Sequence, residues 1–116
     1  MAGYVFYSSS DSKLDEIWQY SEDTHGTRQA EKYMLGLHAY LQNLSENKKI
    51  WKKLPKNLTV SDDLDVQLYF NKYEYHFIYF REFPSGKIGI MSILHETMDI
   101  PVRLKEDLGK INDGNL

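Results

Sequence analysis

The chain has 116 residues, 41% hydrophobic and 27% charged, with a net charge of −3, a size and composition that suit one folded domain with a single core. It contains no cysteine, which excludes disulfides, thiolate catalysis and cysteine-based zinc sites. Because residues 1–10 lack a secretory pattern and no window approaches the ~20 apolar residues of a membrane helix, we expect a cytoplasmic protein.

The first elements predicted are a short strand and a helix. Residues 3–8 are aromatic and β-branched, which favours a strand, and residues 9–12 are polar turn and helix-capping types. The apolar residues that follow recur at one-turn spacing, namely Leu14, Ile17 and Trp18. This spacing predicts a first helix with one apolar face.

A second, longer helix should follow after a tight turn. Gly26 is suited to end the first helix, and Thr27 is a capping candidate for the second. The apolar residues keep the helical period to about Glu46, and they are Ala30, Tyr33, Met34, Leu37, Tyr40, Leu41 and Leu44. Gly36 interrupts this helix, which indicates close packing against a neighbour.

The second half of the sequence predicts a three-stranded antiparallel meander. Residues 50–65 contain Pro55 and no clean period, so we expect a connecting loop with at most one helical turn. Residues 66–81 alternate as two strands broken near residues 71–72, and the Phe-Pro-Ser-Gly turn at 83–86 should join them to a last strand. The predicted class is α+β, in the order β-α-α-β-β-β.

The helical hairpin should pack on one face of this sheet and leave the other face without an evident cover. We expect either the 48–65 segment or a partner protein to cover it. Residues 100–104 should add a short packed segment, so that the domain spans residues 1–108 and residues 109–116 form a polar tail.

A polar cluster follows the apolar last strand, where His95, Glu96 and Asp99 come close together in the sequence. A metal site is disfavoured because adjacent strand residues point to opposite faces, and an acid-base pair is a second possibility. The structural alternative is that His95 donates to a backbone carbonyl and Asp99 caps the terminal segment. Recognition of a partner is the functional reading.

A basic cluster precedes the meander and comprises Lys48, Lys49, Lys52, Lys53 and Lys56. Lysines at a helix end complement the helix dipole, which is the simplest interpretation. A surface for phosphate or for an acidic partner is the alternative.

Four segments carry motifs with a shared family resemblance. Residues 15–20 contain Asp/Glu-Ile-Trp-x-Tyr, and residues 26–33 contain Gly-x-x-x-Ala-x-x-Tyr. Residues 76–81 end in Tyr-x-Arg, close to the Tyr-Arg ending typical of the penultimate strand, and residues 93–99 read Ile-Leu-His-x-x-Met-Asp. In this order, over residues 4–104, the chain resembles the RelE/ParE superfamily of bacterial toxins and especially its ParE branch.

The resemblance implies a small toxin that arrests growth and is neutralised by a cognate antitoxin encoded beside it. ParE-type members are associated with poisoning DNA gyrase, whereas RelE-type members cut messenger RNA on the ribosome. We expect a ParE-like gyrase inhibitor that needs no cofactor. A ribosome-dependent, metal-independent endoribonuclease and a non-toxic interaction module remain the alternatives.

Two arginines common in the family are replaced here by Gln67 and Ser92, which favours the inhibitor, because phosphate chemistry without a metal requires fixed positive charge. For the inhibitor, the expected partner-binding residues are Arg81, His95, Glu96, Met98, Asp99 and Arg103. For the endoribonuclease, the catalytic residues would be Arg81, Tyr79 and His95, with a lysine of the basic cluster.

Overall fold

The computed structural model describes residues 3–54 and 67–112. Its elements, in chain order, are β1 (Tyr4–Phe6), α1 (Ser8–His25), α2 (Thr27–Glu46), the 3-10 turn η1 (Lys48–Ile50), β2 (Lys52–Lys53), β3 (Tyr69–Tyr73), β4 (His76–Glu82), β5 (Ile88–His95) and α3 (Ile100–Asn112). The α+β class and the predicted core order of strand, two helices and three strands are confirmed, and the structure adds β2 and α3.

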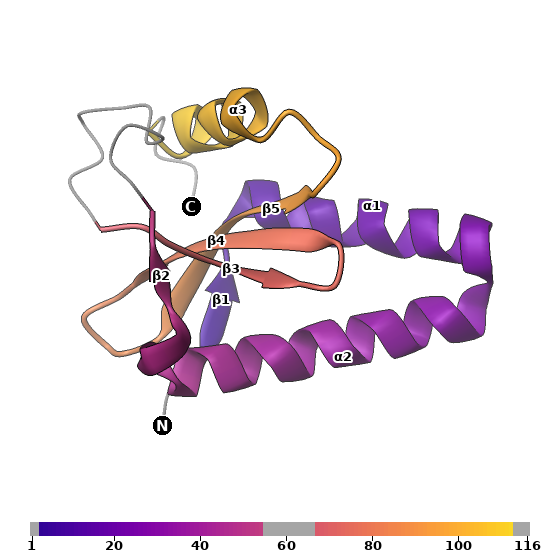
Figure 1. Ribbon diagram of the computed structural model, residues 1–116, viewed down its shortest axis with the longest axis horizontal. Helices are drawn as coiled ribbons and strands as arrows, with labels where there is room; N and C mark the ends of the chain where they lie inside the picture. The colour runs from indigo at the N-terminus through magenta and orange to yellow at the C-terminus, as the bar shows by residue number, and fades with distance from the viewer. Residues whose placement is uncertain (1–2, 55–66, 113–116) are drawn as a thin grey trace.

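The strands form one mixed sheet in the order β1-β5-β4-β3-β2 (Figure 1). Strands β3, β4 and β5 make the predicted antiparallel meander, while β1 runs parallel to β5 at one edge. The other edge is β2, which pairs antiparallel with β3 through Lys52 and Lys53. The prediction of a loop was therefore wrong at these two residues, and residues 55–66 of the predicted loop lie outside the described part of the chain.

The predicted break between the first two meander strands was misplaced. Strand β3 runs without interruption through Asn71 and Lys72, and the turn lies at Glu74 and Tyr75. Asn71 stays in the strand because its side-chain amide donates a 2.9 Å hydrogen bond to the carbonyl oxygen of Ile50, so its polar group stabilises η1 instead of a turn. Glu74 takes the positive φ that the turn requires, 53°.

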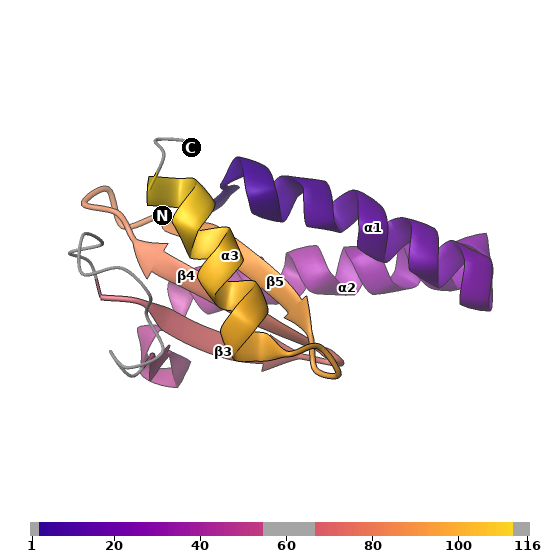
Figure 2. The ribbon, with the colours of Figure 1, turned by 90° about the horizontal axis from the view of Figure 1, so that it is seen from above.

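The two helices of the hairpin cover one face of the sheet and α3 covers the other (Figures 1 and 2). The core on the hairpin side includes Leu37, Leu41, Ile78, Phe80 and Ile90. The core on the α3 side includes Leu68, Tyr79, Leu94, Leu104 and Leu108. Helix α3 thus covers the face that we expected the 48–65 segment or a partner protein to cover. It runs to Asn112, through the first four residues of the predicted tail.

Local backbone features explain the helix boundaries. Gly26 ends α1 with a φ of 89°, as predicted, and Gly86 has a φ of 93° in the turn before β5. Helix α1 begins at Ser8, the last residue of the predicted strand and one residue before the predicted capping cluster, and the residue that precedes α2 is Gly26 rather than Thr27. Gly36 packs closely against Tyr73, whose hydroxyl oxygen would lie 2.2 Å from an added Cβ. The prediction of close packing at this glycine is confirmed.

Within residues 3–54 and 67–112, none of the helices combines the length and the apolar character that crossing a membrane requires.

Candidate functional site

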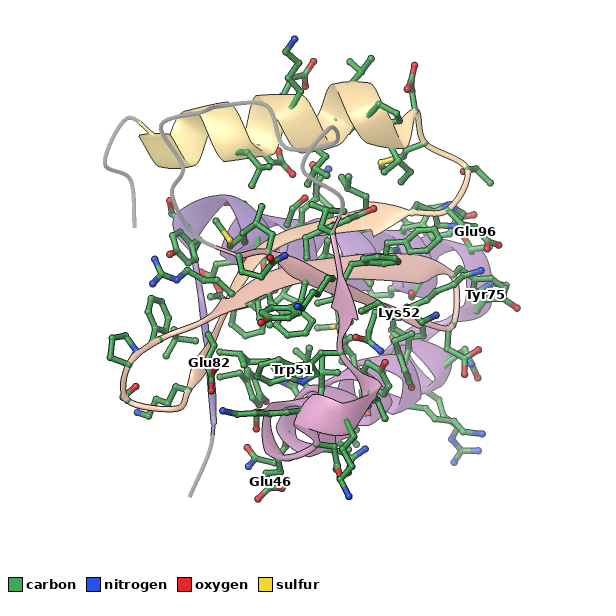
Figure 3. The ribbon with its side chains drawn as sticks, turned by 60° about the vertical axis from the view of Figure 1, so that its left-hand side comes forward. Glu46, Trp51, Lys52, Tyr75, Glu82 and Glu96 are labelled. Atoms are coloured by element: carbon green, nitrogen blue, oxygen red, sulfur yellow. The ribbon has the colours of Figure 1, made fainter. Side chains whose placement is uncertain are left out.

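A cleft lies between the hairpin and the end of the sheet where β4 begins and β5 ends. It consists of two adjoining cavities of about 390 and 430 Å³ that share Tyr20, His76 and His95. The first cavity is also lined by Lys13, Glu16, Ile17, Ile93, Thr97 and Met98, and the second by Ser21, His25, Gln29, Tyr33 and Tyr75. Figure 3 shows Tyr75 and Glu96 together at this end of the sheet, far from Glu46 and Glu82.

A β-bulge places His95 in this cleft. The register between β4 and β5 shifts by one residue between Tyr79 and Phe80, so that His95 pairs with His76. Ile90 and Ile93 consequently face the same core although they are three residues apart, and the side chain of His95 follows them toward the hairpin. A regular ladder would have turned His95 to the α3 face, since residues of one strand alternate between faces.

His76 and Tyr33 form a part-buried hydrogen-bonded pair at the base of the cleft. The Tyr33 hydroxyl lies 2.5 Å from Nδ1 of His76. Burial, with a smaller contribution from neighbouring His95, lowers the pKa of His76 to about 4, and burial raises the pKa of Tyr33. His76 is therefore neutral near pH 7 and holds a fixed orientation.

His95 is held by the turn that follows it. The Thr97 backbone N–H donates to Nδ1 of His95 at 3.1 Å, and the Thr97 hydroxyl lies 2.7 Å from the same nitrogen. Because Nδ1 accepts, the proton of the neutral ring is on Nε2. The expected donation from His95 to a backbone carbonyl is thus replaced by acceptance from a backbone amide. The centroid of the His95 ring lies 5.2 Å from that of His76, with the rings edge to face, and 6.4 Å from that of Tyr75, with the rings stacked.

The other residues of the predicted C-terminal cluster surround this end of the sheet. Glu96 forms a 2.5 Å ion pair with Lys72, which lowers the pKa of the Glu96 carboxyl. Met98 lines the cleft and is 37% exposed. Asp99 directly precedes α3, and its carbonyl oxygen accepts from the Arg103 N–H at 3.0 Å, as expected of a residue that begins a helix. The side chain of Arg103 is exposed and lies 3.6 Å from Glu106.

Arg81 and Tyr79 lie elsewhere, on the α3 side of the sheet. Tyr79 is 4% exposed and packs in the core beneath α3, where burial raises its pKa to about 12. The Arg81 guanidinium lies over the Phe83 ring at 4.7 Å, and among the described residues its buried Nε has no hydrogen-bond partner. Arg81 is also about 17 Å along β4 from His76, at ~3.4 Å per residue. The three residues expected to form an RNA-cleaving site do not meet.

The basic cluster lies at the far end of α2 and on the β2 edge. Lys48 pairs with Glu82, and Lys52 lies over the Phe70 ring at 6.0 Å. Lys49 and Lys53 are exposed, and Lys56 lies outside the described residues. Lys48 follows the end of α2 and lies about 22 Å from Tyr33 along the direction of that helix, at 1.5 Å per residue. These lysines therefore form a surface separate from the cleft.

Sequence reasoning missed several residues of the cleft. Tyr20 and Tyr33 belong to the quoted motifs, but Tyr20 was given no role of its own and Tyr33 was interpreted as helix packing. Lys13, Tyr75 and His76 were given no role in the cleft. The available signal was His76, which begins a strand predicted to pair with the strand that ends in His95. Among the described residues, no group of three or more His, Asp or Glu side chains is placed to hold a metal ion.

Comparison of the sequence with models of known protein families and with curated proteins finds no match.

Proposed function

We propose that this protein is the toxin of a toxin-antitoxin pair and that it acts in the ParE manner, by binding DNA gyrase. The observation that supports this proposal is the convergence of the four motif segments on one cleft. Each segment contributes lining residues: Ile17 and Tyr20 from the first, Tyr33 from the second, His76 from the third, and Ile93, His95 and Met98 from the fourth.

The exposure of these residues favours binding over packing as the common purpose of the motifs. Ile17 and Ile93 are buried and serve the core, but Tyr20 is 63% exposed and Met98 is 37% exposed. Tyrosine and methionine side chains are enriched in the contact surfaces of protein complexes. A cleft with buried walls and an aromatic rim therefore suits insertion of side chains from a protein partner.

The arrangement of the charged groups favours an inhibitor over an RNase. Cleavage of RNA without a metal requires a cation and a proton-transfer group around one phosphate. Arg81 and Tyr79 face α3, whereas His95 faces the hairpin. Among the described residues that line the cleft, the one lysine is Lys13, and it is paired with Glu16 at 3.1 Å.

The proposal implies a cytoplasmic protein with two partners, gyrase and a neutralising antitoxin. An antitoxin that covers the cleft rim would block access of the target to His95 and Met98. Helix α3 already covers the second face of the sheet, so a partner is not needed to cover that face, and we assign partner binding to the cleft.

The proposal is tested by tightly regulated expression in a bacterial host, with viable counts and plasmid supercoiling as the readouts. We expect a fall in viability together with relaxation or cleavage of plasmid DNA. Met98→Asp should restore growth, while the matched control Leu35→Asp, on the exposed surface of α2, should remain toxic. Full viability with the wild-type protein present at high level would rule out the toxin proposal.

A further inference from the structure

The larger of the two cavities is lined mostly by aromatic side chains, and two of these, Tyr20 and Tyr75, do not pack in the core. Tyr20 comes from α1 and Tyr75 from the turn before β4, and they are 63% and 58% exposed. Tyr33, His76 and His95 add further rings, and Ser21, His25 and Gln29 complete the lining. Exposed tyrosines at the mouth of a cavity offer their ring faces to a ligand, because their area is not used in packing.

Burial or hydrogen bonding favours the uncharged form of two rings in this cavity, those of His76 and His95. His76 is neutral near pH 7, since burial lowers its pKa to about 4. His95 accepts at Nδ1 from the Thr97 amide, which is the bonding pattern of a neutral ring. The faces of neutral aromatic rings carry a negative electrostatic potential and attract cations.

Two lysines near the cleft, Lys13 and Lys72, are each paired with a carboxylate. Lys13 is paired with Glu16, and Lys72 is paired with Glu96. Glu74 is exposed and forms no ion pair with the residues that the structure describes. Burial is the main cause that raises the pKa of Tyr33, and the charge of Glu74, which directly precedes Tyr75 in the chain, adds a smaller contribution in the same direction. The electrostatics therefore favour a cationic ligand.

We propose that this aromatic cavity binds an arginine side chain of the target protein, inserted between Tyr20 of α1 and Tyr75 of the β3–β4 turn. Arginine fits better than lysine, because a planar guanidinium stacks on ring faces and can donate to a carboxylate in its plane at the same time. Tyr75 and His95 supply stacked rings, and Glu74 supplies the nearby carboxylate. The inference rests on the proposed function only in naming the target as the source of the arginine.

The cavity is tested first with purified protein and three acetylated, amidated pentapeptides of alanine with arginine, lysine or citrulline at the centre. Binding is followed by NMR shifts of the His76, His95 and Tyr75 ring protons. We expect the arginine peptide to bind at least tenfold tighter than its neutral isostere, the citrulline peptide, and tighter than the lysine peptide. Equal shifts with arginine and citrulline would overturn the proposal and would point to an apolar ligand.

Variants then locate the binding. Tyr75→Leu should weaken binding of the arginine peptide about fivefold, as loss of one cation-π contact predicts, while Tyr75→Phe should restore it. Glu74→Gln should also weaken binding, and the matched control Glu46→Gln, at the other end of α2, should leave it unchanged. If Glu74→Gln and Glu46→Gln have equal effects, the carboxylate is not part of the site.

The source of the arginine is tested by gyrase inhibition with the Tyr75→Leu protein. Because the Tyr75 side chain is exposed, this substitution should leave the fold intact. Weaker inhibition, with recovery in Tyr75→Phe, supports the proposal. Unchanged inhibition by a variant that no longer binds the arginine peptide would overturn the assignment to the target while leaving the toxin proposal intact. Arginine binding by a protein that does not affect gyrase would instead contradict the proposed function and leave only the cation site.

Discussion

The neutral state of His76 makes the stability of the protein depend on pH in a defined direction. The pKa of His76 is about 4 in the folded protein, against 6.5 for the free side chain. Between these values the unfolded chain binds the proton and the folded chain does not. The contribution of His76 is therefore fully present above about pH 6.5 and is lost progressively as the pH falls toward about 4.

The size of this effect follows from the two pKa values. The pKa of His76 is 6.5 in the unfolded chain and about 4 in the folded protein. When the pH falls from about 7.5 to about 5, this difference lowers the free energy of unfolding by about 2 kcal/mol. The His76 side chain is only half-buried, so solvent screens its charge, and we expect about half of this value, ~1 kcal/mol.

The assay is urea unfolding at both pH values of the wild-type protein and of His76→Asn. The asparagine side chain keeps a polar group near the position of Nδ1, within reach of the Tyr33 hydroxyl, but does not titrate. Lys72 lowers the pKa of Glu96, so protonation of Glu96 in acid also reduces the stability. This loss occurs in both proteins and cancels in the comparison. If both proteins lose the same stability between the two pH values, burial of neutral His76 is not the cause of the shift.

Three further predictions concern the packing around the cleft and the α3 face. Ser92→Ala should destabilise the protein by about 2 kcal/mol in urea unfolding, because the buried Ser92 hydroxyl donates to the Asp107 carboxylate at 2.6 Å; an effect below about 0.5 kcal/mol would contradict this. Gly36→Ala should be destabilising in the wild type, where its Cβ would lie 2.2 Å from the Tyr73 hydroxyl oxygen, yet neutral or stabilising in a Tyr73→Phe background, where the nearest ring carbon is 3.4 Å away; equal effects in a double-mutant cycle would rule out this contact as the cause. Arg81→Leu should leave gyrase inhibition within about twofold of wild type, since it lies ~17 Å from the cleft; a tenfold loss would show that the α3 face also contacts the target.

Local patterns predicted most of the fold because local chemistry determines those elements. The helical hairpin follows from apolar periodicity and from Gly26, which takes the positive φ between two helices. The last hairpin follows from Pro84 and Gly86 in the turn. Helix α3 was missed because Pro101 was interpreted as part of a short packed segment. Proline is nevertheless tolerated in the first turn of a helix, where a backbone N–H would have no intrahelical partner.

The cleft was only partly predictable because it depends on features that carry no local signature. Counting back from the turn at residues 83–86 in a regular ladder would pair His76 with Leu94 rather than with His95. The bulge changes both the partner and the face of His95, and nothing in the sequence around Tyr79 or Phe80 marks it. The β3–β4 turn was likewise hidden, since Glu74 is an uncommon residue at positive φ.

The central claim is tested most directly by adding purified protein to DNA gyrase in supercoiling and cleavage assays, beside a ribosome-programmed messenger RNA cleavage assay. The Met98→Asp and Leu35→Asp proteins serve as cleft variant and surface control. We predict gyrase inhibition by the wild type and the control, loss of inhibition in Met98→Asp, and intact messenger RNA in every reaction. Cleaved messenger RNA with unaffected gyrase would contradict the account and would move the active site to residues outside the cleft.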